Sequence, residues 1–475
     1  MGMEMKNKKE ENVKNEKNVN NGTHISRSEL PALGFLLIVS LVSLIAINSL
    51  NPFLYWDENV YSGNARSHLG ESNFTEDFRF PLIEYIIAGV WFFTGESVFV
   101  ARLIIILFSV SSILLFYLIA REYFSKDFSF FLCVLFAFCP LMLLWGFRIG
   151  TDISAMFFIS LSFYLLLKGE NKMTFTAFAG AFAAVSFLVR FSSGLFALSV
   201  LIYFIFKRKP KELIIFTVFF LAALSPWLAY NQVTYGNPVW DLQMQYSVVA
   251  EWTYPEPFAK QLVNFFVFTN ILIPLLFVFG IYYLLKYRKF NSKLKLLILI
   301  YLIVSFTIYF FFVNLKEERY YLMFLPFIYI ISFRGLLWLG SNQRKIFRWA
   351  LTALIVVFIV QSLFVFSYIY SKNYCDSNNS IMKSVSYLED KVGKNDVILT
   401  NVIPWVGYNL NAKTHCLCDM TAPLEMHNFT YVVYNDREGS RYDLEILDNS
   451  SILKLEKTFT SGCSENTYIY KRIKK

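Results

Sequence analysis

The stretch GFLLIVSLVSLIAINSLNPFLYWDENVYSGNARSHL, residues 34–69, decides the fold. It begins with an apolar run whose length suits a helix that crosses about 30 Å of hydrocarbon. It then places two adjacent carboxylates, Asp57 and Glu58, directly after Tyr55 and Trp56. Charge at the end of a packed membrane helix is costly and usually functional. We therefore expect a membrane protein that carries chemistry at the membrane surface.

The composition of the whole chain supports a multi-pass membrane protein. Of 475 residues, 56% are hydrophobic and 19% aromatic, whereas soluble domains contain about 45–50% apolar residues. Apolar runs recur along the chain and predict about eleven membrane-spanning helices. The expected spans are residues 32–50, 97–120, 128–146, 153–168, 173–189, 191–206, 212–230, 261–285, 295–313, 320–338 and 350–370.

Two further segments are expected to lie along the membrane surface. Residues 80–95 are apolar but short, and Glu84 interrupts them. If they crossed the membrane, the basic loops that follow would lie outside, against the usual charge bias. Residues 58–69 place Tyr61, Ala65 and Leu69 on one stripe. Both segments are therefore predicted to be amphipathic juxtamembrane helices.

The net charge of +9 reflects membrane topology more than a nucleic-acid site. The basic residues gather in short loops, such as KRKPK at 207–211, that alternate with mixed or acidic loops. This pattern places the N-terminus in the cytoplasm and the C-terminal region outside, in what we expect to be the plasma membrane. Residues 1–31 then form a disordered cytoplasmic tail, and residues 32–370 the membrane domain.

Residues 371–475 are expected to form a small α/β domain outside the membrane. NNSIMKSVSYLEDKVGKND predicts an amphipathic helix, and VILTN, TYVVYND and TYIYKRI predict short strands. This region holds Cys375, Cys416, Cys418 and Cys463, which in an oxidising compartment suggest up to two disulfides of undetermined connectivity. A zinc site with His415 or His427 is an alternative, although the spacing matches no recognised motif.

Several charged residues fall at the outer ends of the predicted helices. A carboxylate there can act as a general base on an acceptor, and arginines can hold a phosphate by bidentate hydrogen bonds. A hydrophobic groove beside them would accommodate a lipid tail. The candidates are Asp57, Glu58, Arg66, Arg79, Arg148, Asp152, Arg190 and Arg319.

Each candidate also has a structural explanation. Asp57, Glu58 and Asp152 are residue types that cap helices or suit the first turn. Arg66, Arg79 and Arg148 could anchor lipid headgroups. Arg190 is harder to explain in this way, because the loop that contains it has almost no other polar residue.

The order of these segments resembles the GT-C membrane glycosyltransferases that use polyprenyl-phosphate sugars. This class includes the protein O-mannosyltransferases and the lipid A aminoarabinose transferases. The resemblance rests on YWDENVYSGNARSHL, FRFPLIEYIIAGVWFFTGESVFVARL, FRIGTDISAMFF, LVRFSSGLFAL and ERYYLMFLPFIYI, and it covers residues 32–340.

The resemblance implies roles for particular residues. Asp57 would be the catalytic base, with Glu58 orienting or binding beside it. Asp152 and Arg148 would line the donor or acceptor pocket. Arg79 and Arg190 would stand at or next to basic residues that contact the lipid phosphate. Arg319 falls in an Arg-Tyr-Leu element near a later outer loop, and Arg319 and Arg66 are further substrate-binding candidates. The family usually has His or Lys and a double proline where this chain reads RFPL, which weakens the transfer to Arg79.

The expected partners are a polyprenyl-phosphate sugar donor, membrane lipid and a protein, glycan or lipid acceptor, but no nucleic acid. Some branches of the family need a divalent metal and others do not; we expect none here. The alternatives are a lipid or solute transporter, or an inactive scaffold that displays the C-terminal domain. Transporters usually bind their substrate at mid-membrane between repeats, whereas these charges cluster at one predicted face.

Overall fold

The computed structural model describes residues 26–71, 74–169, 172–252, 256–287, 294–315, 317–342, 344–377, 379–410, 412–417, 424, 427–436, 444–461 and 465–473. The predicted tail lies almost entirely outside this part. The chain forms two compact units: unit 1 consists of Met1–Ile47 and Leu103–Val365, and unit 2 of Asn48–Arg102 and Phe366–Lys475. Residues 48–102, which follow the first membrane helix, thus belong to the same unit as the C-terminal residues.

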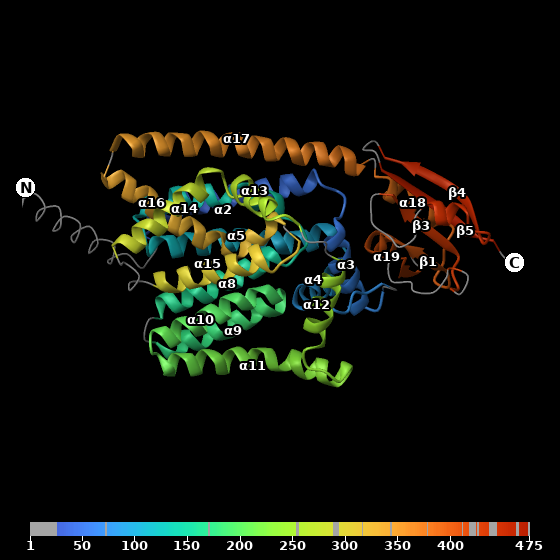
Figure 1. Ribbon diagram of the computed structural model, residues 1–475, viewed down its shortest axis with the longest axis horizontal. Coiled ribbons are helices and arrows are strands. Elements are labelled where there is room, and N and C mark those ends of the chain that lie inside the picture. Colours follow the sequence, from blue (N-terminus) through green and yellow to red (C-terminus); the bar gives the residue numbers. More distant parts are fainter. Residues whose placement is uncertain are drawn as a thin grey trace, which may run out of the picture. The chain divides into compact units, whose positions relative to one another are not determined.

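Unit 1 is helical (Figure 1). Three helices, α2, α5 and α17, run from one unit into the other. The helices are α2 (Leu30–Ser49), α5 (Val98–Arg121), α6 (Lys126–Ala137), α7 (Pro140–Trp145), α8 (Asp152–Lys168), α9 (Met173–Val189), η1 (Phe191–Ser193), α10 (Gly194–Phe206), α11 (Pro210–Tyr235), α12 (Trp240–Trp252), α13 (Phe258–Phe268), α14 (Leu272–Lys286), α15 (Lys295–Phe311), η2 (Glu318–Phe324), α16 (Leu325–Asn342) and α17 (Arg344–Ser377).

Five described helices are long and apolar enough to cross a membrane, and a bent pair raises the number to six. The five are Leu30–Ser49, Val98–Arg121, Pro210–Tyr235, Glu318–Ser341 and Phe347–Val365. The chain is a multi-pass membrane protein, as predicted. Shorter apolar helices, including Met173–Val189 and Lys295–Phe311, coincide with other predicted spans.

Two predicted spans are interrupted. Residues 261–285 form α13 and α14, which meet at an angle of 97°. Asn270 at the break has a positive φ of 83°, a conformation that asparagine tolerates better than most residues. Residues 128–146 form α6 and α7, because the chain turns at Phe138 and Cys139 before Pro140 starts a new helix.

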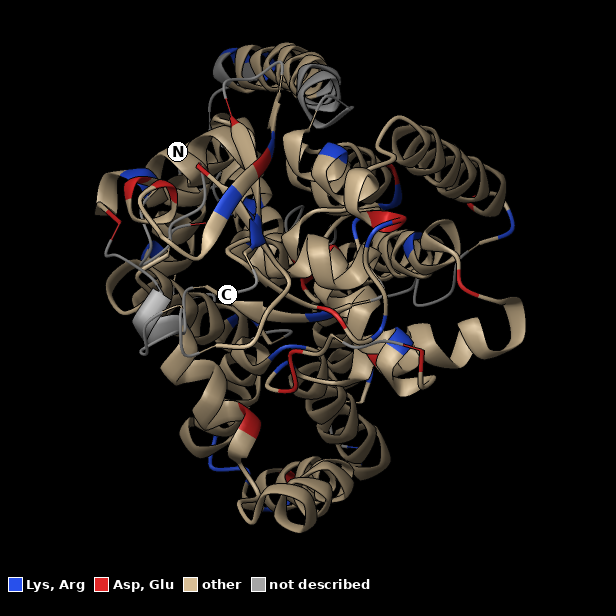
Figure 2. Ribbon diagram, turned by 90° about the vertical axis from the view of Figure 1, so that its right-hand side faces the viewer, with Lys and Arg blue, Asp and Glu red and all other residues tan. Residues whose placement is uncertain are grey.

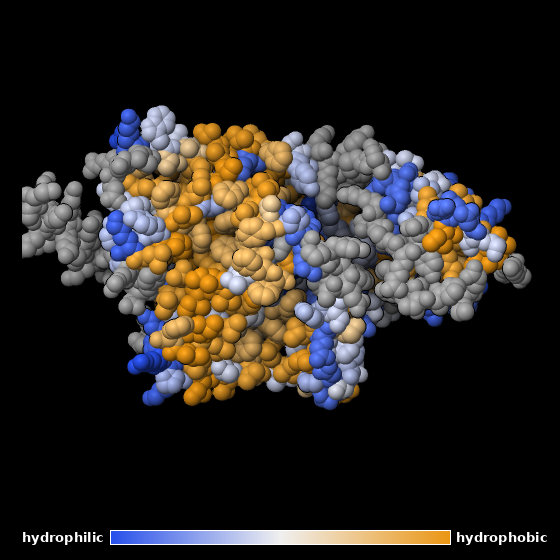
Figure 3. All heavy atoms as spheres, viewed as in Figure 1, coloured by the Kyte–Doolittle hydropathy of each residue, from blue (hydrophilic) through white to orange (hydrophobic). Residues whose placement is uncertain are grey.

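Unit 1 presents an apolar surface with charge mostly at its helix ends. Figure 3 shows hydrophobic residues over the side of the helix bundle and hydrophilic residues at the ends of its helices. Phe35, Val218 and Leu363 are more than half exposed on α2, α11 and α17. Figure 2 shows most of the helical ribbon without Lys, Arg, Asp or Glu. Such a surface suits contact with lipid.

Small residues allow close helix contacts inside unit 1. A Cβ atom on Gly280 of α14 would lie 2.1 Å from the carbonyl oxygen of Ile331 in α16, and one on Gly335 would lie 2.5 Å from the backbone of Gly280. Helices in lipid gain stability from this kind of backbone approach. The helix α9 contacts both α8 and α11. A Cβ atom on Gly180 of α9 would lie 2.4 Å from the carbonyl oxygen of Phe216 in α11.

Unit 2 combines two helices of the first loop with a mixed sheet. The helices are α3 (Trp56–His68) and α4 (Leu82–Thr94). The helix α4 has 13 residues, or about 20 Å at 1.5 Å per residue. The remaining elements are α18 (Ser380–Glu389), β1 (Val397–Thr400), α19 (Ile403–Asn409), β2 (Lys413–Cys416), β3 (Tyr431–Asn435), α20 (Leu444–Asp448), β4 (Leu453–Thr460) and β5 (Asn466–Arg472).

The five strands lie in the order β2-β1-β3-β5-β4. The strand β1 is parallel to β2 and β3, whereas β5 is antiparallel to β3 and β4. One buried cluster contains Val385 of α18, Val406 of α19 and Val433 of β3; a second contains Leu399, Val432 and Tyr470. The predicted helix and three strands are therefore confirmed, while β2, β4 and α19 were not predicted.

The glycine contact between α14 and α16 gives a stability prediction. Replacing Gly335 with Ala should lower the melting temperature of the detergent-solubilised protein, because overpacking costs about 1–3 kcal/mol. Gly34→Ala is the matched control, since no atom lies within 4 Å of a Cβ built there. Equal melting temperatures for the two variants would contradict the close packing.

Candidate active site

The acid pair lies in the first turn of α3, within unit 2. Glu58 is almost completely buried, and both of its oxygens are engaged. Arg102 donates from Nε to Oε1 at 2.8 Å and from Nη2 to Oε2 at 2.9 Å. The backbone N–H of Tyr55 also donates to Oε2 at 3.0 Å, which caps the helix. Glu58 thus holds the start of α3 in place, as the structural explanation predicted.

Arg102 is the residue that sequence reasoning missed. It is 2% exposed, and it also donates to Asn48 Oδ1 at 3.0 Å, to the carbonyl of Phe53 at 2.7 Å and to the carbonyl of Asn51. Arg102 therefore connects residues 48–53 to Glu58 through hydrogen bonds. The signal was present, because a single arginine in the apolar run VFVARL has to be paired.

Asp57 forms an ion pair with Arg79. The Nη2 atom of Arg79 lies 3.4 Å from Asp57 Oδ1, and its Nε donates to Glu76 at 2.9 Å. Burial alone would lower the pKa of Arg79, but the charges of Glu76 and Asp57 raise it above the usual arginine value. Arg79 therefore carries a permanent positive charge beside the predicted base.

A polar network between α3 and α4 supports this ion pair. Asn64 donates to the carbonyl of Glu76 at 3.1 Å and to Glu84 Oε2 at 2.7 Å, and it accepts from the backbone N–H of Glu76. Burial raises the pKa of Glu84, although the hydrogen bonds from His68 and Asn64 act in the opposite direction. Asn64 thus joins the loop that carries Arg79 to α3, and it also joins α3 to α4.

Arg66 contacts the C-terminal part of unit 2. It donates to the carbonyl of Tyr408 at 2.7 Å, pairs with Glu96 at 3.1 Å and lies over the Tyr408 ring. Near the other end of α3, Trp405 donates to the carbonyl of Leu54 at 3.0 Å and packs edge-on against Trp56. These contacts dock α19 on α3 and account for Arg66 without a substrate.

In unit 1, Asp152 and Arg190 come together. Asp152 begins α8, and Arg190 Nη1 lies 3.2 Å from its Oδ1 and donates to Thr151 at 2.9 Å. Burial alone would lower the pKa of Arg190, but the Asp152 carboxylate raises it above the usual arginine value. The Arg190 guanidinium also lies over the ring of Tyr320, 5.4 Å from its centroid.

Arg148 and Arg319 converge on one indole ring. Their guanidinium carbons lie 4.8 Å and 5.1 Å from the centroid of Trp145. Arg319 also pairs with Glu317. The predicted site residues divide between the two units. Unit 1 contains Arg148, Arg190 and Arg319, and unit 2 contains Asp57, Glu58, Arg66 and Arg79.

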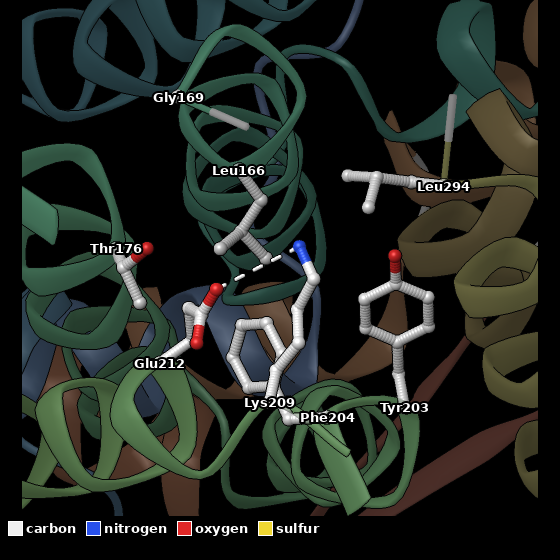
Figure 4. Close-up of a pocket in the computed structure, with 8 residues that line it drawn as sticks. All are labelled: Leu166, Gly169, Thr176, Tyr203, Phe204, Lys209, Glu212 and Leu294. Carbon is white, nitrogen blue, oxygen red and sulfur yellow. Dashed lines mark ion pairs between the residues drawn. The ribbon is translucent and has the colours of Figure 1, made fainter. Parts of the chain in front are cut away.

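A hollow elsewhere in unit 1 contains none of the predicted site residues. It is lined by Leu166, Gly169, Thr176, Tyr203, Phe204, Lys209, Glu212 and Leu294. Figure 4 shows Lys209 and Glu212 as an ion pair on this hollow. Their pairing satisfies both charges, and the hollow carries no predicted chemistry.

The metal and cysteine predictions are resolved only in part. Within the described residues, no group of three or more His, Cys, Asp or Glu side chains could hold a metal ion. Cys133 and Cys139 are free and buried, whereas Cys416 is disulfide-bonded. The side chains of Cys375, Cys418 and Cys463 lie outside the described residues, so the connectivity stays undetermined.

Comparisons with solved structures and with family sequences agree on one class of protein. The fold is that of the GT-C membrane glycosyltransferases. ArnT from Cupriavidus metallidurans, bound to undecaprenyl phosphate, matches with a TM-score of 0.68 and 12% identity over 92% of this chain and 97% of ArnT. The oligosaccharyltransferase AglB from Archaeoglobus fulgidus, in complex with an inhibitory peptide and a dolichol-phosphate, matches with a TM-score of 0.56 and 12% identity over 86% and 70% of the two chains.

The family match is narrower and lies in the sequence itself. Residues 79–230 match the family described as dolichyl-phosphate-mannose-protein mannosyltransferase, so this part of the chain is similar to that family of glycosyltransferases. No curated protein sequence matches the chain. The predicted resemblance is thereby confirmed. The family match contains Arg79, Arg102, Arg148, Asp152 and Arg190.

The Glu58–Arg102 pair predicts a strong effect on stability. Arg102→Met should destabilise the protein by about 3–5 kcal/mol, because it leaves a buried carboxylate without a partner. The double variant Glu58→Met/Arg102→Met should recover part of this loss, as measured by melting temperature in detergent. A double variant that is no more stable than Arg102→Met would show that the pair does not govern stability.

Proposed function

We propose that this protein transfers a sugar from a polyprenyl-phosphate donor to an acceptor at the outer membrane face, with Asp57 as the general base. The observation that carries the proposal is the pairing of a carboxylate with an arginine in each unit, Asp57 with Arg79 and Asp152 with Arg190. The family of residues 79–230 is named for a dolichyl-phosphate-mannose donor, and the similar ArnT was solved with undecaprenyl phosphate.

The proposed reaction is a displacement at the anomeric carbon of the sugar. The acceptor oxygen or nitrogen forms a bond to this carbon while Asp57 takes the acceptor proton. The bond between the anomeric carbon and the phosphate oxygen breaks, and the lipid phosphate leaves with the electron pair. Positive charge near the leaving phosphate stabilises the negative charge that develops on it.

The contacts suggest different roles for the predicted residues. Arg190, Arg148 and Arg319 are the proposed phosphate ligands, and Asp152 orients Arg190 through the 3.2 Å ion pair. Arg79 is the proposed counter-ion of Asp57. Glu58 and Arg66 act as positioning residues, because Arg102 engages Glu58 and the Tyr408–Glu96 pair engages Arg66.

The proposal includes the membrane topology expected from the sequence. The shorter apolar helices of unit 1 would cross the membrane together with the long ones, which gives about eleven spans. The N-terminus would lie in the cytoplasm and residues 371–475 outside the cell membrane. The acceptor would then approach from the outside.

Loss of the base should stop transfer without stopping donor binding. Asp57→Asn should lower the single-turnover rate with a radiolabelled polyprenyl-phosphate sugar by about 10²–10⁴-fold, while the affinity for the donor changes little. Asp127→Asn, at an exposed aspartate in the first turn of α6, is the control and should retain activity. Turnover near the wild-type rate in Asp57→Asn would remove Asp57 from the mechanism.

Arg190 tests the phosphate site. Arg190→Ala should weaken donor binding by roughly 10–100-fold, because a hydrogen bond to a charged group contributes about 1.5–3 kcal/mol. Arg121→Ala is closely matched, since Arg121 has the same 16% side-chain exposure and pairs with Glu29. If Arg190→Ala altered only the dependence on acceptor concentration, the phosphate role would be wrong.

A further inference from the structure

The ring of Trp145 contacts two arginines of unit 1. It is the last residue of α7, and the guanidinium groups of Arg148 and Arg319 both lie over its ring, at 4.8 Å and 5.1 Å from the centroid. Arg148 lies three residues later, in the loop between α7 and α8, whereas Arg319 belongs to η2. One side chain therefore links two arginines that are distant in sequence.

Two guanidinium groups at one site repel each other, and both are poorly exposed. Arg148 is 6% exposed, and the side chain of Arg319 is 15% exposed. The Trp face carries negative electrostatic potential, so it attracts both cations and is the strongest aromatic partner for arginine. Glu317 supplies a carboxylate for Arg319. The indole thus helps to keep two like charges near each other before any anion binds.

The position of Trp145 is itself fixed by its neighbours. Gly146 follows it, and a Cβ atom there would lie 2.3 Å from the carbonyl oxygen of Met142 and 3.1 Å from Leu44. Ser109 of α5 donates to the carbonyl of Gly146 at 2.6 Å. The backbone beside the indole is therefore in contact with α2, α5 and α7, which limits the movement of the ring that supports the two arginines.

We propose that Trp145 is a positioning residue of the donor site, which holds Arg148 and Arg319 ready to bind the phosphate of a polyprenyl-phosphate ligand. The inference rests on the proposed function. Pre-organised arginines lose less side-chain freedom on binding an anion, so the indole should raise affinity for the lipid phosphate. Because it does not touch the reacting atoms, it should affect donor binding more than the chemical step.

The test compares two substitutions at Trp145 in the full-length protein. Trp145→Phe keeps an aromatic face with a weaker attraction for cations, and Trp145→Leu keeps only an apolar side chain. Binding of radiolabelled polyprenyl phosphate and transfer kinetics with the sugar-bearing donor are measured at several salt concentrations. Trp145→Leu should raise both the Kd and the donor KM by about tenfold, Trp145→Phe by less, and kcat should change little in either.

A matched control separates positioning from general stability. Trp227→Phe alters a buried tryptophan of unit 1, whose Nε1 donates to Asp241 at 2.8 Å, and it should leave donor KM unchanged. If Trp145→Leu binds the donor and shows a donor KM like the wild-type protein, the inference is wrong but the proposed function stands. The inference is also wrong if Trp145→Leu and Trp145→Phe lose donor affinity equally and in proportion to a lower melting temperature. A wild-type protein that neither binds polyprenyl phosphate nor transfers sugar would overturn the proposed function, and the inference with it.

Discussion

The candidate site depends on the requirement that a buried charge must have a partner. A protein surrounded by hydrocarbon cannot leave a carboxylate or guanidinium unpaired without a large cost. The described structure meets this requirement by pairing Glu58 with Arg102, Asp57 with Arg79, and Asp152 with Arg190. Each pair fixes a helix end or a loop, so the charges predicted to be functional also organise their surroundings.

The pairs differ in how completely they are satisfied, and this difference suggests which residues can react. Glu58 and Arg102 are buried and joined by two hydrogen bonds, so they are unsuited to change partners during a reaction. The contact between Asp57 and Arg79 is longer, at 3.4 Å, and their side chains are 19% and 17% exposed. The looser pairing of Asp57 is the reason that Asp57, and not Glu58, is the proposed base.

The sequence predicted most elements but not the way in which residues 48–102 group. Apolar length and periodicity predicted the long apolar helices, α3 and α4, and strand propensity predicted β1, β3 and β5. The breaks at Asn270 and before Pro140 were missed because hydropathy averages over a turn of two or three residues. The grouping of residues 48–102 with the C-terminal domain depends on long-range contacts such as Trp405 with Leu54, which no local pattern reveals.

The site residues were predicted as a set, but their partners were not. Outer loops and family order identified the acids and arginines, yet the sequence could not show that Arg66 docks on Tyr408 or that Glu58 is held by Arg102. Arg102 was hidden in an apolar helix. Trp145 was passed over because aromatic residues are common in this chain, and only the three-dimensional structure shows two arginines over its ring.

The central claim is that these paired charges serve the transfer of a sugar from a lipid phosphate. The most direct test follows a polyprenyl-phosphate donor labelled in the sugar, in membranes that contain the wild-type protein and in membranes that lack it. The account predicts that label leaves the lipid fraction, and that free polyprenyl phosphate appears in equal amount, only when the protein is present. Label that stays on the lipid with every sugar and acceptor fraction supplied would contradict the account.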